Sequence, residues 1–130
     1  MNKKILIAGA IFGVLAVALG AFGAHGLKGL ISLEAQQTFE TGVRYQMYHA
    51  ILLLIVGQTS YLSNRSKNST YYFLVFGMVF FSGSIYALAT NDLTSFDFKT
   101  IALLTPLGGL LLIASWLIML FNFFKIKQDK

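Results

Sequence analysis

The sequence predicts an all-α membrane protein with four transmembrane helices and an amphipathic interfacial helix between the first and the second. Hydrophobic residues make up 56% of the 130-residue chain and charged residues only 12%, whereas an average soluble domain has roughly 25% charged residues. Four long apolar stretches contain no Asp or Glu, at residues 5–24, 45–62, 71–90 and 105–124. Each is close to the length of about 20 residues that a helix needs to cross a bilayer. We therefore expect a single four-helix transmembrane domain over residues 1–130.

The first predicted span, residues 5–24, carries small residues along one helical face. At steps of three or four residues these are Gly9, Gly13, Ala16 and Gly20. Small side chains let two helix backbones approach closely within lipid. We expect this face to pack against another helix of the same chain, with formation of a homo-oligomer as the alternative. The basic start of the chain also resembles a signal peptide, but the apolar run exceeds the usual length of about 7–15 residues.

The connector before the second span is the least membrane-like part of the chain. Ser32 is placed to cap a helix, and Glu34 would lie in the first turn, where a negative charge favours the helix dipole. Glu40 and Arg44 form a favourable i,i+4 pair. Residues 33–45 are thus expected to form an amphipathic helix at the outer interface, running into the second span with or without a bend.

The second half of the chain contains two further spans and their connectors. Residues 63–68 are expected to form a short basic loop before the third span, and residues 91–98 a second outer loop. Pro106 is the only proline, and proline suits the first turn of a helix. The fourth helix is therefore expected to begin near Pro106 with Thr105 as its cap, or to be kinked there.

The Lys and Arg residues are unevenly shared between the two sides that four spans create. The side with both termini holds seven of them: Lys3, Lys4, Arg65, Lys67, Lys125, Lys127 and Lys130. The other side holds three: Lys28, Arg44 and Lys99. The side rich in positive residues is normally cytoplasmic, so we expect both termini in the cytoplasm. Because helix ends account for the net charge of +5, membrane lipid is the expected partner and nucleic acid is not.

Five polar residues near the outer boundary form the candidate site. They are His25, Glu40, Arg44, Gln46 and His49. Ionisable groups in membrane spans usually face the protein interior or a wet cavity, so we expect these side chains to meet in one hydrogen-bonded cluster, either structural or functional. Glu40 is the expected charge partner of Arg44.

Catalytic, metal and cofactor sites are not expected. The chain has no cysteine and no recognisable catalytic motif. Two histidines could in principle ligate a haem, or zinc together with Glu40, but they have no characteristic spacing.

Four short segments together resemble a known family. They are GAFGAHGL at residues 20–27, FETGVRYQMYHA at 39–50, FSGSIY at 81–86 and TPLGG at 105–109. In this order and spacing they resemble the YgdD/YwdK-like small membrane proteins, an uncharacterised family with a domain of unknown function. Ser115 before Trp116, where the family often has Gly, is a minor departure. The resemblance implies a bacterial inner or plasma membrane protein with about four helices, and it implies no catalytic residues.

Three function classes remain open, of which the least favoured is an enzyme acting on a lipid of the outer leaflet, with an acid or base in a cavity beside His25 and His49. A non-enzymatic structural or interaction role in the cell envelope fits the small size and sparse polarity. The alternative is binding or transport of a small solute, a lipid or a proton through the polar residues at the outer boundary. A pore within one chain is not favoured, because the middle of the predicted bundle contains little polarity.

Overall fold

The computed structural model describes residues 2–94 and 102–127, and four long helices dominate this part of the chain. They are α1 (Asn2–Ala21), α2 (Leu33–Gln58), α3 (Asn64–Ala89) and α4 (Leu104–Phe124). Within these residues the one element of β type is an isolated bridge between Lys28 and Ile31. The predicted all-α class is therefore confirmed.

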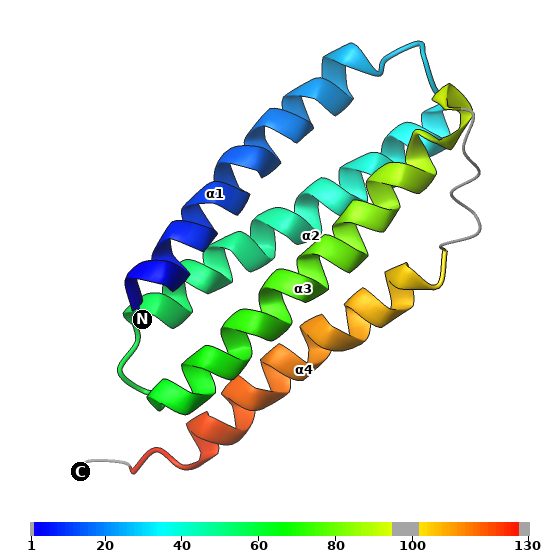
Figure 1. Cartoon of the computed structure of the whole chain (residues 1–130). Helices are drawn as coiled ribbons and strands as arrows, with labels where there is room; N and C mark the ends of the chain where they lie inside the picture. Colours follow the sequence, from blue (N-terminus) through cyan, green and yellow to red (C-terminus); the bar gives the residue numbers. More distant parts are fainter. Residues whose placement is uncertain (1, 95–101, 128–130) are drawn as a thin grey trace.

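The helices lie side by side in chain order and alternate in direction (Figure 1). α1 packs on α2, α2 on α3, and α3 on α4. α1 and α4 lie at opposite edges of this row (Figure 1). Both chain termini and the α2–α3 turn share one end of the molecule, and the α1–α2 connector lies at the other.

α1 continues into a short π-helix, η1, over Phe22–Gly26. The wider turn is closed by the amide of Leu27, which donates to the carbonyl of Phe22 over 3.1 Å. Gly29 then adopts a left-handed φ of 83° and turns the chain toward α2. Leu27 is only 1% exposed and packs with Phe39 and Ala89, which fixes the connector against α2 and α3.

α2 is one continuous helix that includes the predicted interfacial segment. It starts as expected, with the Ser32 side chain accepting a hydrogen bond from the amide of Ala35 over 3.0 Å. It ends at Gln58, earlier than the predicted span end at Leu62, because Thr59 is extended with ψ 145°. Leu62 instead folds back into the core, where it is 4% exposed.

The predicted loop at residues 63–68 is wrong for most of its length. Ser63 is an N-cap whose hydroxyl accepts from the amide of Ser66 over 3.1 Å, so α3 already begins at Asn64. At the other end, α3 is followed by a short 3-10 helix, η2, over Asn91–Leu93. The rest of the predicted outer loop, at residues 95–98, lies outside the described residues.

α4 begins at Leu104, two residues before the predicted position. Pro106 lies in its first turn, where the missing N–H breaks no helical bond. The expected Thr105 cap is wrong, since Leu103 occupies the cap position without a side-chain hydrogen bond. The Thr105 hydroxyl bonds the hydroxyl of Ser84 on α3 instead.

Glycines set the closest approach of α3 and α4. A Cβ added to Gly108 would overlap the backbone of Phe80 and Phe81. A Cβ added to Gly77 would lie 2.7 Å from the Leu112 side chain and 3.2 Å from the carbonyl oxygen of Gly108. The two backbones thus meet where neither helix has a side chain, as in other lipid-embedded helix pairs.

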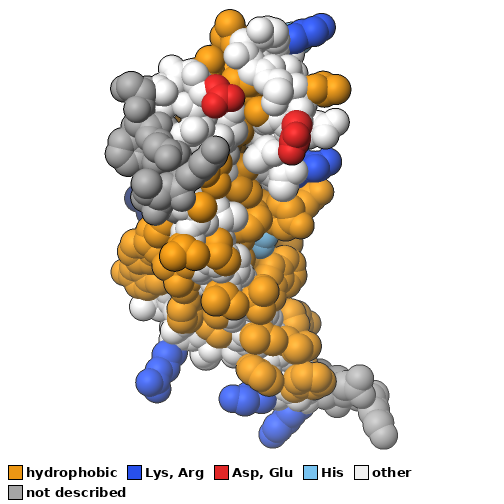
Figure 2. All heavy atoms as spheres, turned by 90° about the vertical axis from the view of Figure 1, so that its right-hand side faces the viewer, with side chains coloured by type: hydrophobic (Ala, Val, Ile, Leu, Met, Phe, Trp, Pro, Cys, Tyr) orange, Lys and Arg blue, Asp and Glu red, His pale blue; other side chains and the backbone are white. Residues whose placement is uncertain are grey.

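Three helical segments of the described part are long and apolar enough to cross a membrane: Asn2–Gly26, Asn64–Ala89 and Leu104–Phe124. α2 is not among them, because Arg44, Gln46 and His49 interrupt its apolar run. Figure 2 shows a broad apolar band across the middle of the face in view, with Lys and Arg at the lower end and both acidic and basic side chains at the upper end.

Candidate functional site

Gln46 links three helices in the interior of the molecule. Its side chain is 4% exposed. Its amide nitrogen donates to the carbonyl of Phe12 on α1 over 2.9 Å, and its amide oxygen accepts from the Tyr86 hydroxyl on α3 over 2.6 Å. Both ends of the amide are therefore bonded within the protein, as a buried polar group requires.

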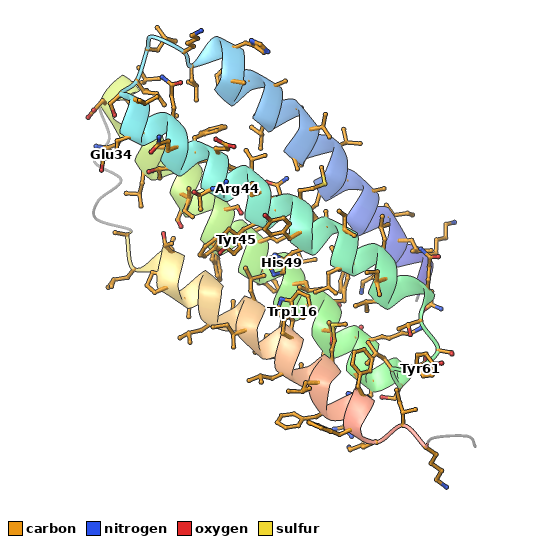
Figure 3. The ribbon with its side chains drawn as sticks, turned by 180° about the vertical axis from the view of Figure 1, so that it is seen from behind. Glu34, Arg44, Tyr45, His49, Tyr61 and Trp116 are labelled. Atoms are coloured by element: carbon orange, nitrogen blue, oxygen red, sulfur yellow. The ribbon has the colours of Figure 1, made fainter. Side chains whose placement is uncertain are left out.

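His49 links α2 to α4 (Figure 3). The indole N–H of Trp116 lies 3.1 Å from Nε2 of His49, and Nδ1 of His49 lies 2.7 Å from the carbonyl oxygen of Tyr45. An indole can only donate, so Nε2 is the acceptor. Nδ1 then carries the proton and donates a hydrogen bond to the carbonyl oxygen of Tyr45. The two bonds together define a neutral imidazole with one tautomer and no free ring nitrogen.

Two more polar contacts tie α3 to its neighbours. The Ser82 hydroxyl donates to the carbonyl of Gly42 on α2 over 2.8 Å. Gly42 lets α2 approach α3 closely enough for this contact, because a Cβ there would lie 2.7 Å from the ring of Tyr86 on α3. With the contact of Ser84 to Thr105, each pair of neighbouring helices is joined by at least one side-chain hydrogen bond.

Arg44 and Glu40 lie on a different side of α2 from Gln46. Side chains two residues apart on a helix are separated by about 200°, so Arg44 and Gln46 face almost opposite directions. Arg44 and Glu40 are both exposed. The Arg44 guanidinium donates to the Thr41 hydroxyl over 3.3 Å, while the Glu40 carboxylate forms no hydrogen bond or ion pair with any described residue.

A groove of about 520 Å³ opens between α2 and the end of α1 with η1, and we call it the Arg44 groove. Its polar wall on α2 consists of Gln36, Gln37, Glu40 and Arg44. The opposite wall consists of Gly20, Gly23 and Ala24, with Val43 and Phe39 between the two.

The five predicted polar residues therefore do not form one hydrogen-bonded cluster. Gln46 and His49 are buried and bonded to other helices, whereas Glu40 and Arg44 line a surface groove. His25 is exposed in η1 and has no polar contact with a described residue. The expected Glu40–Arg44 ion pair is also absent from the described contacts. Helix periodicity separates Glu40 and Arg44 from Gln46 and His49, which lie on a different face of α2.

The four small residues predicted to mediate packing also differ in whether another helix lies close to them. A Cβ on Gly9 would lie 2.9 Å from the Leu54 side chain and 3.0 Å from the carbonyl oxygen of Ala50, so α1 meets α2 closely there. Ala16 is 1% exposed, and a Cβ on Gly20 would lie 3.3 Å from Val43. Gly13 has nothing within 4 Å of its added Cβ. Most of this face is already covered within the chain.

A second groove, of about 460 Å³, lies on the face between α2 and α4. Tyr45, His49 and Trp116 line it, together with aliphatic side chains of α2 (Figure 3). Its polar groups are the bonded ring nitrogens of His49 and Trp116 and the hydroxyls of Tyr45 and Tyr48, and the rest of its lining is apolar.

The end of the molecule that carries the termini has its own polar contacts. Lys67 is 5% exposed, and its ammonium donates to the Asn2 side chain over 3.3 Å. Lys4 donates to the Tyr72 hydroxyl over 3.0 Å and lies over the Tyr71 ring at 4.6 Å. Among the described residues, no group of three or more His, Cys, Asp or Glu is arranged to hold a metal ion.

Sequence reasoning located Gln46 and His49 but missed Phe12, Tyr86 and Trp116 as their partners. Trp116 gave a signal, because an indole N–H in the middle of a span needs an acceptor. The carbonyl of Phe12 gave none, since every residue has one.

Comparison with known proteins identifies the family. Residues 19–109 match a family described as protein of unknown function DUF423. The chain belongs to this family. A UPF0382 membrane protein of Staphylococcus haemolyticus is 41% identical over 95% of this chain and 97% of its own length. The UPF0382 membrane protein YwdK of Bacillus subtilis is 44% identical over 88% of this chain and 91% of its own.

The similarity extends to a more distant bacterium. A UPF0382 membrane protein of Haemophilus influenzae is 35% identical over 98% of this chain and 99% of its own. The predicted resemblance to YwdK-like membrane proteins is thus confirmed. No solved structure matches the chain.

Proposed function

We propose that this family member is a non-enzymatic protein of the bacterial plasma membrane that crosses the bilayer four times and binds a phospholipid of the outer leaflet in the Arg44 groove. The observation that carries the proposal is the division of polar residues on α2. Gln46 bonds to α1 and α3, both ring nitrogens of His49 are bonded within the protein, and Arg44 and Glu40 remain available in the groove.

The packing of α2 supports the fourth span. It has 26 residues, about 39 Å at 1.5 Å per residue, against a hydrocarbon thickness of about 30 Å. It lies between α1 and α3 along its length (Figure 1). Its polar buried side chains bond to neighbouring helices, which reduces the cost of placing them in lipid. The excess length of about 9 Å, roughly six residues, then lies at the outer interface at the start of α2.

The charge distribution supports a cytoplasmic location for both termini. The described basic residues Lys3, Lys4, Arg65, Lys67, Lys125 and Lys127 belong to the end of the molecule that carries the termini. Under the positive-inside rule that end faces the cytoplasm. The Arg44 groove then lies toward the opposite, outer leaflet.

The groove suits a lipid because it combines apolar and charged walls. Gly20, Ala24 and Val43 offer an apolar surface for the upper part of an acyl chain, and Arg44 offers donors for a phosphate. A proton or solute pathway receives less support, because the ring nitrogens of His49 and the amide of Gln46 are already bonded.

The test is phospholipid retention by the purified full-length chain. Ala24 is exposed and lines the groove, and Ala21 is exposed and does not. The wild type should retain phospholipid after washing in mild detergent. Ala24→Trp, which fills the groove, should lose it, and Ala21→Trp should keep it. Equal thermal stability of the two variants would show that both fold. Retention by Ala24→Trp equal to that of the wild type would contradict the proposal.

A further inference from the structure

We propose that the Arg44 groove selects a lipid with a phosphoethanolamine head group, with the phosphate on Arg44 and the ammonium on Glu40. The inference rests on the proposed function, since it names the class of lipid that the groove takes. It depends on three features of the groove: two charges without a charged partner, their order along α2, and the apolar surface beside them.

The two charges are opposite and are not joined to each other. Arg44 makes one side-chain hydrogen bond, to Thr41, although a guanidinium has five N–H donors. The carboxylate of Glu40, one helical turn away on the same groove wall, has no hydrogen bond or ion pair with a described residue. A zwitterionic ligand can satisfy both groups at once, whereas an anion alone would be repelled by the Glu40 carboxylate.

The order of the charges matches the order within the head group. With the start of α2 at the outer surface, Glu40 lies farther from the middle of the bilayer than Arg44, by about 6 Å for four residues of helix. In a phospholipid the phosphate is joined to the glycerol, and the amine lies at the far, watery end of the head group. Phosphate at Arg44 therefore brings the ammonium to the level of Glu40.

The chemistry of the two residues separates phosphoethanolamine from phosphocholine and phosphoglycerol head groups. Guanidinium N–H groups form paired, charge-assisted hydrogen bonds with phosphate oxygens. The primary ammonium has N–H donors for the Glu40 carboxylate. A choline group has none, and a glycerol head group has no positive charge. Arg44 should therefore bind many phospholipids, and Glu40 should favour the one with a primary amine.

The experiment measures the binding of short-chain lipids to the delipidated full-length protein by native mass spectrometry. The lipids are phosphatidylethanolamine, phosphatidylcholine and phosphatidylglycerol with identical acyl chains, and the soluble comparison is glycerophosphoethanolamine. The variants are Glu40→Gln and Arg44→Gln. The control is Glu34→Gln, which removes an exposed carboxylate from the same helix outside the groove.

The wild type should bind phosphatidylethanolamine up to about fivefold more tightly than phosphatidylcholine, the size expected of one exposed ion pair. Glu40→Gln should remove this preference by weakening phosphatidylethanolamine alone. Arg44→Gln should weaken both lipids, and Glu34→Gln should change neither.

Equal affinity of the wild type for the two zwitterionic lipids, together with lipid loss in Ala24→Trp, would overturn the head-group selection and leave lipid binding intact. Lipid binding that Ala24→Trp does not reduce would overturn both. Glycerophosphoethanolamine binding as tightly as the lipid would overturn a lipid as the occupant.

Discussion

Trp116 on α4 donates its indole N–H to Nε2 of His49 on α2 across the open face between these helices, over 3.1 Å. The bond spans two helices that are not neighbours in the row, because α4 packs mainly on α3. The two rings also meet edge to face, with centroids 6.0 Å apart. This contact therefore links α2 to α4, two helices that each pack mainly on α3 or α1.

Removal of either side chain should therefore loosen α4. His49→Leu and Trp116→Phe should each lower stability in detergent, and their effects should be coupled by about 0.5–1.5 kcal/mol, as for other hydrogen bonds between membrane helices. A double-mutant cycle from thermal unfolding measures this coupling. Tyr48→Phe is the control, because the structure gives the exposed Tyr48 hydroxyl no hydrogen bond to a described residue. Additive effects of the two substitutions would contradict the bond.

Gln46 should behave differently from His49, because its loss leaves a buried group behind. Gln46→Leu leaves the Tyr86 hydroxyl without its acceptor, at a cost of about 1–3 kcal/mol. Adding Tyr86→Phe removes the stranded hydroxyl, so the double variant should recover part of this loss. Thermal unfolding of the two single variants and the double variant tests the expectation. A double variant less stable than Gln46→Leu would show that Tyr86 contributes mainly through other contacts.

The glycines of α1 offer a matched comparison. Gly9→Leu should destabilise the protein by about 1–3 kcal/mol, the usual size of overpacking, because its side chain would enter the backbone of α2. Gly13→Leu should be tolerated, since nothing lies within 4 Å of an added Cβ. Both positions have the same residue and the same spacing pattern, so a difference in unfolding temperature isolates the helix contact. Equal losses would place the contact elsewhere on α1.

This pair also shows how far the sequence could predict the packing. The GxxxG spacing identifies the face of α1 that approaches another helix, but Gly9 and Gly13 are identical in that pattern. Which of them touches α2 depends on where the two helices cross. That position is set by side chains of both, such as Leu54 on α2 and Leu6, whose side chain meets Gly57.

Capping shows the same difference between local and distant information. The Ser32 cap was predictable because hydroxyl and amide lie three residues apart. Ser63 had the same signal, but its basic and polar surroundings favoured a loop. Thr105 was expected to cap α4, and its hydroxyl bonds Ser84 on another helix. Local sequence indicates that a hydroxyl needs a partner, and only the fold decides which partner is nearer.

The sequence could predict the level along the helix at which the candidate-site residues lie, but not the residues to which they bond. Arg44, Gln46 and His49 all interrupt an apolar run, which indicates polar contacts at that level of the helix. Helix periodicity separates Arg44 from Gln46, a signal that the expectation of one cluster overlooked. The partners Tyr86 and Trp116 come from helices far along the chain, and their registers against α2 depend on the packing of all four helices.

The proposed orientation can be tested directly, because the chain has no cysteine. Lys127→Cys lies at the end with the termini, and Lys28→Cys lies in the α1–α2 connector at the other end. Both positions are exposed. In intact cells, a membrane-impermeant maleimide should label Lys28→Cys and leave Lys127→Cys unlabelled until the membrane is opened. The reason is the excess of Lys and Arg at the end with the termini, which favours its retention in the cytoplasm.

Labelling of Lys127→Cys alone in intact cells would reverse the orientation and move the Arg44 groove to the inner leaflet. Labelling of both variants would mean that the chain crosses the membrane an even number of times between positions 28 and 127. In that case α2, α3 and α4 would not all cross it.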